Sequence, residues 1–175
     1  MLKRLFRAHA TDDVGRTLYA AVVEQSRAPA LYETLGAPDT VEGRFEIYSL
    51  HVVLLLDRLN EPGEQVKATS QALFDTYVKA LDHALREMGV GDLSVGKKMR
   101  KLGEAFFGRA KSYHAAFAAL PDAEPLRELL TRTVYAEGDP SHVQALADYV
   151  ATQRAHLAAQ PLEGFLGGQV DWRPL

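Results

Sequence analysis

Apolar residues recur at helical spacing through almost the whole chain, and this periodicity limits the fold more than any other feature of the sequence. The strict alternation of apolar and polar residues that marks a half-buried strand is hard to find. Both observations predict an all-α protein. Because no repeat, low-complexity tract or linker-like change in composition divides the 175 residues, we expect a single-domain bundle of about six to seven helices.

Capping residues, glycines and prolines predict where these helices begin and end. Asp39 and Glu42 have the spacing of a capping box. Ser94 can cap the helix that follows a glycine turn, and Asp139 precedes a proline suited to a first helical position. The predicted helices span residues 12–27, 29–36, 39–59, 64–88, 94–120, 124–135 and 140–159.

The helix predicted over residues 39–59 has a nearly continuous apolar surface in its second half, which is typical of a helix surrounded by others. We therefore place it at the centre of the bundle. Its uncharged run from Ile47 to Leu56 is about 15 Å long as a helix, half of the roughly 30 Å that a bilayer requires. Arg44 and Glu46 near its start are costly to enclose unless they are paired, so we expect them to bind neighbouring groups or to face a partner.

The two ends of the chain differ in composition from the predicted helical domain of residues 11–163. Residues 1–10 form a short, amphipathic and basic N-terminus, which we interpret as a frayed first turn rather than an anchor. Acidic residues follow it where a secretory apolar region would begin, so no signal peptide is predicted. Residues 164–175 are expected to form an irregular tail that packs on the domain through Phe165, Leu166 and Trp172.

The sequence offers little for catalysis. It has no cysteine, which excludes disulfides, thiolate metal sites and cysteine nucleophiles. It also lacks a Glu-x-x-His pair, a Gly-x-Ser-x-Gly elbow and a phosphate-binding glycine loop. We predict a protein that is not an enzyme, with no catalytic, cofactor or metal site. The alternative is a helical haem- or metal-dependent enzyme centred on His51, although a hydrogen-bonded core histidine is the favoured interpretation of that residue.

Charge is unevenly distributed along the chain. Residues 94–111 carry six basic side chains and one acidic side chain, in a protein whose net charge is −3. The residues after Leu120 carry four basic and eight acidic side chains. The basic segment could bind the phosphates of an anionic membrane surface or of RNA, and the sequence does not separate the two.

Aromatic residues suggest a second kind of contact, with an apolar helix. A helix-binding groove needs exposed apolar anchors on a helical scaffold. The candidate groove residues are Phe45, Tyr48, Phe106, Phe107 and Tyr113. Phe107 falls off the main apolar stripe of its helix, beside Gly103 and Ala110, and this gap of small residues could receive another helix.

Several ordered motifs resemble one known family. They are residues 39–45 (DTVEGRF) followed by 49–51 (SLH), then 71–75 (QALFD), 85–92 (LREMGVGD) and 107–109 (FGR). Together they span about residues 19–117 and resemble the ubiquinol–cytochrome c chaperone family.

This resemblance implies an assembly factor for respiratory complex III that binds newly made cytochrome b and performs no catalysis. Mitochondrial members work with a small partner at the ribosomal tunnel exit beside the inner membrane. A 175-residue chain without a presequence resembles the bacterial version. We therefore expect a cytoplasmic protein at the inner membrane face, or on the matrix side if the source is eukaryotic, with no DNA partner.

The residues predicted to bind partners are those of the basic segment and of the candidate groove: Arg44, Phe45, Tyr48, Lys97, Lys98, Arg100, Lys101, Phe107, Arg109 and Lys111. The main alternative function is a ribosome- or RNA-binding helical adaptor without a client of its own.

Overall fold

A computed structural model describes the backbone of residues 2–175 and the side chains of residues 11–175. It contains α1 (Leu2–Ser26), α2 (Pro29–Glu33), α3 (Val41–Arg58), α4 (Glu64–Glu87), α5 (Asp92–Ala119), α6 (Glu124–Arg132), α7 (Val143–Ala159) and α8 (Leu162–Leu166), with a short 3-10 helix at Pro140–His142. The described chain contains no strand. The all-α prediction is confirmed, and the six longer helices match the expected number.

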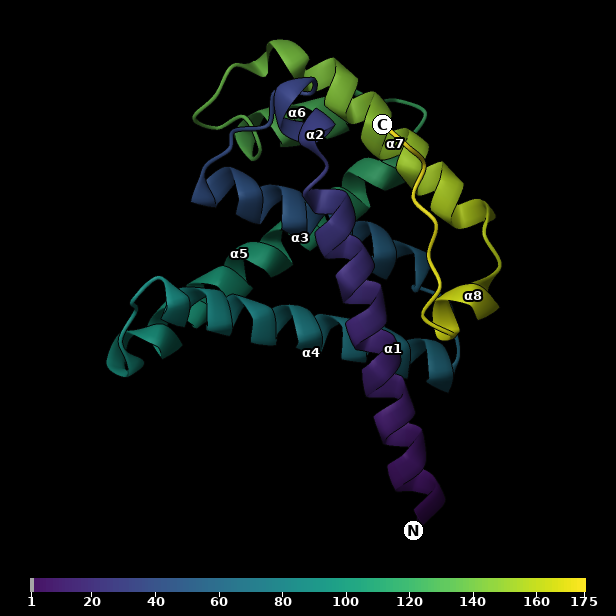
Figure 1. The fold of residues 1–175 in the computed structure, drawn as a ribbon. Helices are drawn as coiled ribbons and strands as arrows, with labels where there is room; N and C mark the ends of the chain where they lie inside the picture. Colours follow the sequence, from purple (N-terminus) through teal and green to yellow (C-terminus); the bar gives the residue numbers. More distant parts are fainter. Residues whose placement is uncertain (1) are drawn as a thin grey trace.

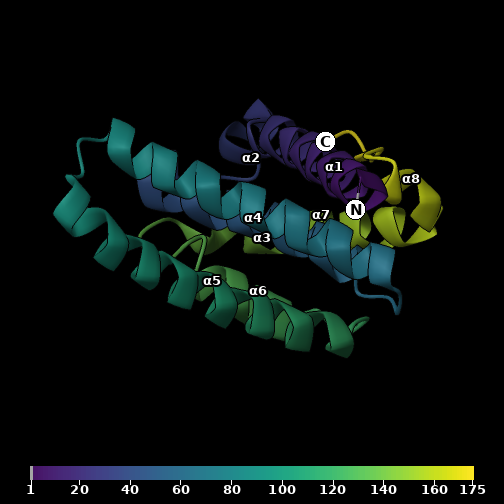
Figure 2. The ribbon, with the colours of Figure 1, turned by 90° about the horizontal axis from the view of Figure 1, so that it is seen from below.

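The helices form three layers (Figure 2). α1, α2 and α8 lie on one side, α3, α4 and α7 form the middle, and α5 and α6 lie on the other side. α1 crosses α4 at a steep angle, and the two helices are in contact along this crossing (Figure 1). α4 and α5 form an antiparallel hairpin whose tip extends beyond the rest of the body.

α3 is the central helix, as its apolar surface predicts. It contacts α1, α4, α5 and α7. Leu50 and Val52 lie on opposite sides of this helix, and both are 0 % exposed, as is Leu55. Because burying one such side chain stabilises a protein by roughly 1.5–3 kcal/mol, the burial of α3 contributes strongly to the stability of the bundle.

Several helix ends differ from the prediction. The backbone of α1 is helical from Leu2 rather than from residue 12, while the side chains of residues 1–10 lie outside the described part, so their amphipathic character stays a prediction. The N-cap of α3 is Thr40, whose hydroxyl accepts a hydrogen bond of 3.0 Å from the Gly43 amide. Asp39 does not cap α3, because its carboxylate binds Arg44. α5 begins at Asp92, two residues before Ser94, because Gly91 is extended and takes the cap position.

The C-terminal third shows one confirmation and two further differences. Asp139 is a cap, as predicted, and accepts a hydrogen bond of 2.9 Å from the Ser141 amide. α6 ends at Arg132 rather than at residue 135. Just after this end, the Thr133 hydroxyl donates to the Leu129 carbonyl. The tail is not wholly irregular, since α8 covers its start, but it packs on the body as expected: Phe165 is buried and the ring of Trp172 meets that of His51.

His51 is a core histidine, as the favoured interpretation holds. It is 0 % exposed, and both ring nitrogens are hydrogen-bonded. Nδ1 lies 2.8 Å from the Ile47 carbonyl, which can only accept, so Nδ1 carries the proton. Nε2 therefore accepts from the Tyr149 hydroxyl at 2.7 Å, and that hydroxyl accepts in turn from the Gln25 amide at 2.9 Å. This chain of hydrogen bonds links α3, α7 and α1 and requires a neutral imidazole.

This network predicts a pH-dependent stability. Burial lowers the pKa of His51 from 6.5 to about 4, against a smaller opposing effect of the Ile47 hydrogen bond. The unfolded chain therefore binds a proton that the folded chain excludes between these two values, and stability falls as pH falls through this window. Between about pH 7.5 and pH 5 the free energy of unfolding should fall by about 2 kcal/mol from this group. Urea unfolding of the wild type and of His51→Gln at both pH values measures it; equal pH dependence in the two proteins would contradict the assignment.

Candidate functional site

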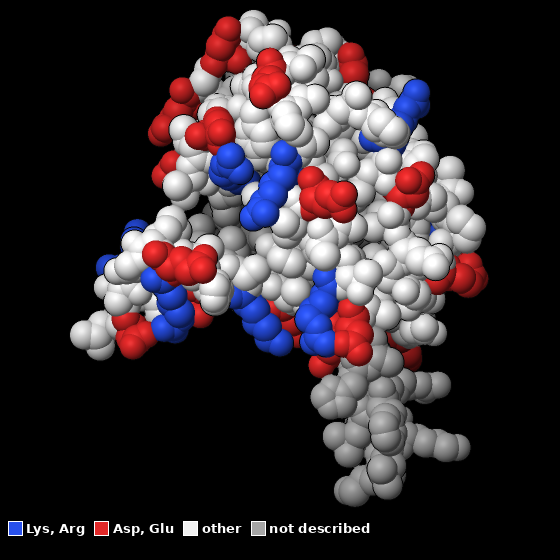
Figure 3. Space-filling model, viewed as in Figure 1, with Lys and Arg blue, Asp and Glu red and all other residues white. Residues whose placement is uncertain are grey.

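A large hollow lies between the α4–α5 hairpin and the face formed by α1 and α3. Its volume is about 580 Å³. Figure 3 shows this side of the molecule hollowed between the projecting hairpin and the body, with basic side chains near the hollow. We call it the groove. Its apolar and aromatic lining includes Tyr19, Val23, Val41, Phe45, Tyr48, Tyr77, Leu81, Leu85, Met88 and Leu102.

The floor of the groove is held rigidly by aromatic packing. The Tyr77 ring lies 5.0 Å from that of Phe106 and 6.4 Å from that of Tyr19. The Tyr77 hydroxyl shares a buried hydrogen bond of 2.8 Å with Ser49, so the one polar atom of this floor residue is satisfied within the protein. The floor therefore presents an apolar surface to whatever enters the groove.

The rim of the groove exposes large apolar side chains. Val41 is 60 % exposed on α3, and Met88 is 54 % exposed at the end of α4. They are two of the five large hydrophobic side chains that the described part of the chain leaves exposed. Exposed apolar surface around a concave, apolar hollow is typical of a binding site for another apolar group.

One end of the groove is basic and aromatic. Arg27 donates to the Tyr48 hydroxyl at 2.7 Å, and Arg44 donates to Asp39 at 2.5 Å while its guanidinium lies 5.2 Å from the centre of the Tyr32 ring. Burial raises the pKa of Tyr32 to about 12. The Tyr32 hydroxyl therefore stays neutral at physiological pH, and this end combines fixed positive charge with an uncharged aromatic ring.

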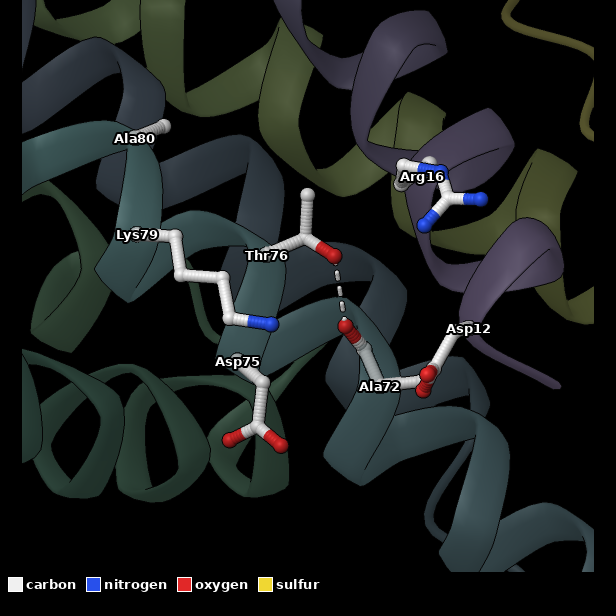
Figure 4. Close-up of a pocket in the computed structure, with 7 residues that line it drawn as sticks. All are labelled: Asp12, Arg16, Ala72, Asp75, Thr76, Lys79 and Ala80. Carbon is white, nitrogen blue, oxygen red and sulfur yellow. Dashed lines mark hydrogen bonds between the residues drawn. The ribbon is translucent and has the colours of Figure 1, made fainter. Parts of the chain in front are cut away.

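A second hollow, of about 310 Å³, lies between α1 and α4 and differs in chemistry (Figure 4). Asp12 and Arg16 reach it from α1, and Asp75 and Lys79 from α4. The two acidic and two basic side chains balance, and Arg16 already binds Asp13. The hollow therefore has neither the apolar lining nor the net charge that would select a ligand.

The match to a family model decides the relationship of this chain to known proteins. Residues 33–172 match the family described as ubiquinol–cytochrome C chaperone. The chain belongs to this family. The matched residues include α3, α4 and α5 and hence three of the four helices that line the groove of this chaperone-family protein.

Named relatives extend this result. The human protein named "Ubiquinol-cytochrome c reductase complex assembly factor 1" is 28 % identical over 161 residues, which cover 90 % of this chain and 53 % of the human protein. The corresponding Xenopus laevis protein is 26 % identical over 90 % of this chain and 80 % of its own length. This chain thus spans about half the length of its human relative.

A solved structure shares the whole fold. The crystal structure of the Cbp3 homolog from Brucella abortus is 33 % identical in sequence, with a TM-score of 0.88 over 99 % of this chain and 97 % of that chain. One glycine of the motifs that suggested the family has a clear structural role. A Cβ atom on Gly43 would lie 2.0 Å from the Pro38 carbonyl oxygen, so only glycine permits the chain to enter α3 this way.

The predicted groove residues divide into three groups. Phe45, Tyr48 and the cation Arg44 line the groove. Phe106 and Tyr113 do not; they are 2 % and 0 % exposed, because the other helices enclose the inner side of α5. Phe107 lies outside the groove and is 62 % exposed, in contact with the rings of Phe74 and Phe106.

The predicted docking cations also divide. Arg109 binds the carboxylate of Glu46 through three hydrogen bonds of 2.9–3.2 Å, so its charge is already paired within the protein. The expectation that Arg44 and Glu46 bind neighbouring groups is confirmed: Arg109 binds Glu46, and Asp39 binds Arg44. The other basic residues of the segment are exposed and form no ion pair with a described side chain: Lys97, Lys98, Arg100, Lys101 and Lys111.

Sequence reasoning missed the groove residues of α1 and also Met88, which follows α4. Tyr19 and Val23 line the groove from α1, yet their spacing resembles that of ordinary core residues. Met88 lines the groove and is exposed, because the hairpin continues past the body. The glycine turn that follows Met88 in the sequence could have indicated this exposure, because residues at the end of a hairpin have fewer neighbours than residues in its middle.

The described residues include neither a candidate metal site nor a candidate membrane-spanning helix. No group of three potential metal ligands occurs among them, and no described helix combines the length and apolarity needed to cross a bilayer. His51, on which the enzyme alternative depends, is sealed in the core with both nitrogens engaged.

Proposed function

We propose that this protein is a chaperone for the assembly of ubiquinol–cytochrome c reductase, and that it holds an apolar helix of newly made cytochrome b in the groove. Membership of the chaperone family and the names of the human and frog relatives support the role in assembly. The groove supports the binding of an apolar helix. The exposure of Val41 and Met88 on its rim is the observation that carries this second step.

The dimensions of the groove suit a helix. Its α4 wall runs from Tyr77 to Met88, which is about 16 Å or three helical turns. A client helix of that length presents anchors on one face at every third or fourth residue, and side chains of this kind fill an apolar groove. Covering Val41 and Met88 would remove apolar surface from water on both partners, which drives the association.

The basic end gives the client a direction. The C-terminal end of a helix carries a partial negative charge from its unpaired carbonyl groups. Arg27 and Arg44 line this end of the groove. Arg27 has no ion-pair partner among the described side chains, so a helix bound with its C-terminus at this end gains electrostatic stabilisation. The opposite orientation would bring its positive end to the same cations. Holding in this way requires no catalytic group.

Photo-crosslinking tests the proposal directly. A photoreactive residue in place of Ala84, which lines the groove, should crosslink to newly made cytochrome b in cells. The matched control is Ala118, which is also an exposed helical alanine but lies on α5 away from the groove. Cytochrome b on Ala84 and not on Ala118 is the expected result.

Two outcomes would contradict the proposal. Equal crosslinking from Ala84 and Ala118 would show that the groove is not the client site. Binding to ribosomes that persists after cytochrome b synthesis is abolished, without any cytochrome b crosslink, would favour the adaptor without a client. The basic segment of residues 94–111 is a surface separate from the groove. The proposed place of action, at the inner membrane face, depends on this segment.

A further inference from the structure

The outward side of α5 combines exposed apolar side chains with free positive charge. α5 lies along the side of the molecule opposite α1 (Figure 2). Its inward stripe includes Val95, Phe106 and Tyr113, all buried. At 100° per residue, the residues on the opposite side share one face of the helix. We call this the α5 outer face; it consists of Leu93, Lys97, Arg100, Glu104, Phe107 and Lys111.

The charges of the α5 outer face are not neutralised within the protein. Lys97, Arg100 and Lys111 are exposed and have no ion-pair partner among the described side chains. Glu104 is the one acidic residue on the face, and Lys101 beside it is also exposed and unpaired. The face therefore carries a net positive charge in a protein of net charge −3. Its electrostatic complement is a surface of closely spaced negative charges.

Two large apolar residues stand at the ends of this charged stretch. Leu93 is fully exposed at the hairpin tip, and Phe107 is 62 % exposed fourteen residues later. The two positions are about 21 Å apart along the helix. Both residues project on the side on which the cations lie, so a flat surface that meets the cations also meets both apolar side chains.

This combination distinguishes between the possible partners. A second copy of the chain would oppose one positive face to another. RNA phosphates would satisfy the cations and a base could stack on Phe107, but RNA offers nothing for the aliphatic Leu93. An anionic bilayer satisfies both kinds of group, since the headgroups attract the lysines and arginines and the acyl boundary accepts leucine and phenylalanine.

We propose that the α5 outer face lies flat on an anionic lipid bilayer, with Leu93 and Phe107 inserted at the level of the acyl boundary. The contact is separate from the groove, whose lining includes neither residue. It goes beyond the proposed function by specifying how the chaperone meets the membrane in which its client is inserted.

Vesicle flotation of the purified full chain tests this contact. The protein should float with vesicles of equal parts phosphatidylcholine and phosphatidylglycerol and should not float with phosphatidylcholine alone. Lys97→Glu/Arg100→Glu should partition on the order of thirty-fold less. Leu93→Ser/Phe107→Ser, which leaves the charge unchanged, should partition on the order of tenfold less.

A charge-matched control separates this face from net charge. Lys67→Glu/Arg132→Glu makes the same change in net charge at exposed positions on α4 and α6 and should float like the wild type. The proposal is overturned if this control loses as much binding as Lys97→Glu/Arg100→Glu, or if Leu93→Ser/Phe107→Ser floats normally. Binding to a ribosomal RNA fragment without flotation would assign the face to RNA instead. The assay contains no cytochrome b, so its result is independent of crosslinking in the groove.

Discussion

Replacing Gly15 by valine is expected to lower the free energy of unfolding by about 3 kcal/mol. Gly15 lies where α1 crosses α4, and an added Cβ atom would lie 2.6 Å from both the carbonyl carbon and the carbonyl oxygen of Ala72. These are backbone atoms, so no side-chain rotation relieves the clash. The two helices must separate, and their apolar contact loosens along the whole crossing. Urea unfolding followed by circular dichroism measures the loss.

The matched control for this prediction has the opposite sign. Gly103 is also inside a helix, but no atom lies within 4 Å of its added Cβ atom. Gly103→Ala should therefore stabilise the protein by about 1 kcal/mol through helix propensity alone. Gly15→Ala gains the same propensity and still should destabilise by about 1–2 kcal/mol, because the clash is larger. A stabilising Gly15→Ala would show that α1 and α4 are not this close.

The helical class was predictable because it depends on a property repeated along the chain. Apolar spacing identified the long helices and placed α3 at the centre, where Leu50 and Leu55 are indeed buried. Helix ends were less predictable, since they depend on single hydrogen bonds. Asp39 and Thr40 are both good caps by composition, and only the ion pair of Asp39 with Arg44 decides between them.

The groove could be predicted only in part, for a different reason. Phe45 and Phe106 have the same character in the sequence, yet Phe45 lines the groove and Phe106 is buried beneath it. Which side of a helix stays uncovered depends on how far its neighbours extend. α4 and α5 continue past the body as a hairpin, and this length difference leaves Met88 and Leu102 on an open surface.

The ion pair of Arg109 with Glu46 could not be predicted from the pattern of charges in the sequence. Arg109 belongs to the basic segment by sequence, but its position on α5 turns it toward α3, where it meets Glu46. Residues 63 positions apart are brought together by the packing of two helices, and no local pattern indicates such a pair. The other basic residues of the segment are exposed and have no ion-pair partner among the described side chains.

Arg109→Met is expected to lower the free energy of unfolding by about 3 kcal/mol, the lower end of the cost of breaking a buried ion pair. The Glu46 side chain is 10 % exposed and that of Arg109 is 32 % exposed. Losing the arginine therefore leaves a carboxylate with little access to water, and this penalty exceeds the value of the lost hydrogen bonds themselves. Lys111→Met removes the same charge from an exposed position of the same helix and should change stability by less than about 0.5 kcal/mol.

Because Glu46 is less exposed than Arg109, the two single variants should differ in stability. The double variant then tests whether the unpaired charge causes the loss. Glu46→Leu should cost about 1 kcal/mol, because the freed Arg109 guanidinium can turn toward water. Glu46→Leu/Arg109→Met replaces the pair by apolar side chains of similar size and should recover to within about 1 kcal/mol of the wild type. Chemical unfolding of all four proteins gives the coupling energy. If the double variant is as unstable as Arg109→Met, the loss comes from packing around the methionine, and the ion pair is not what holds α5 to α3.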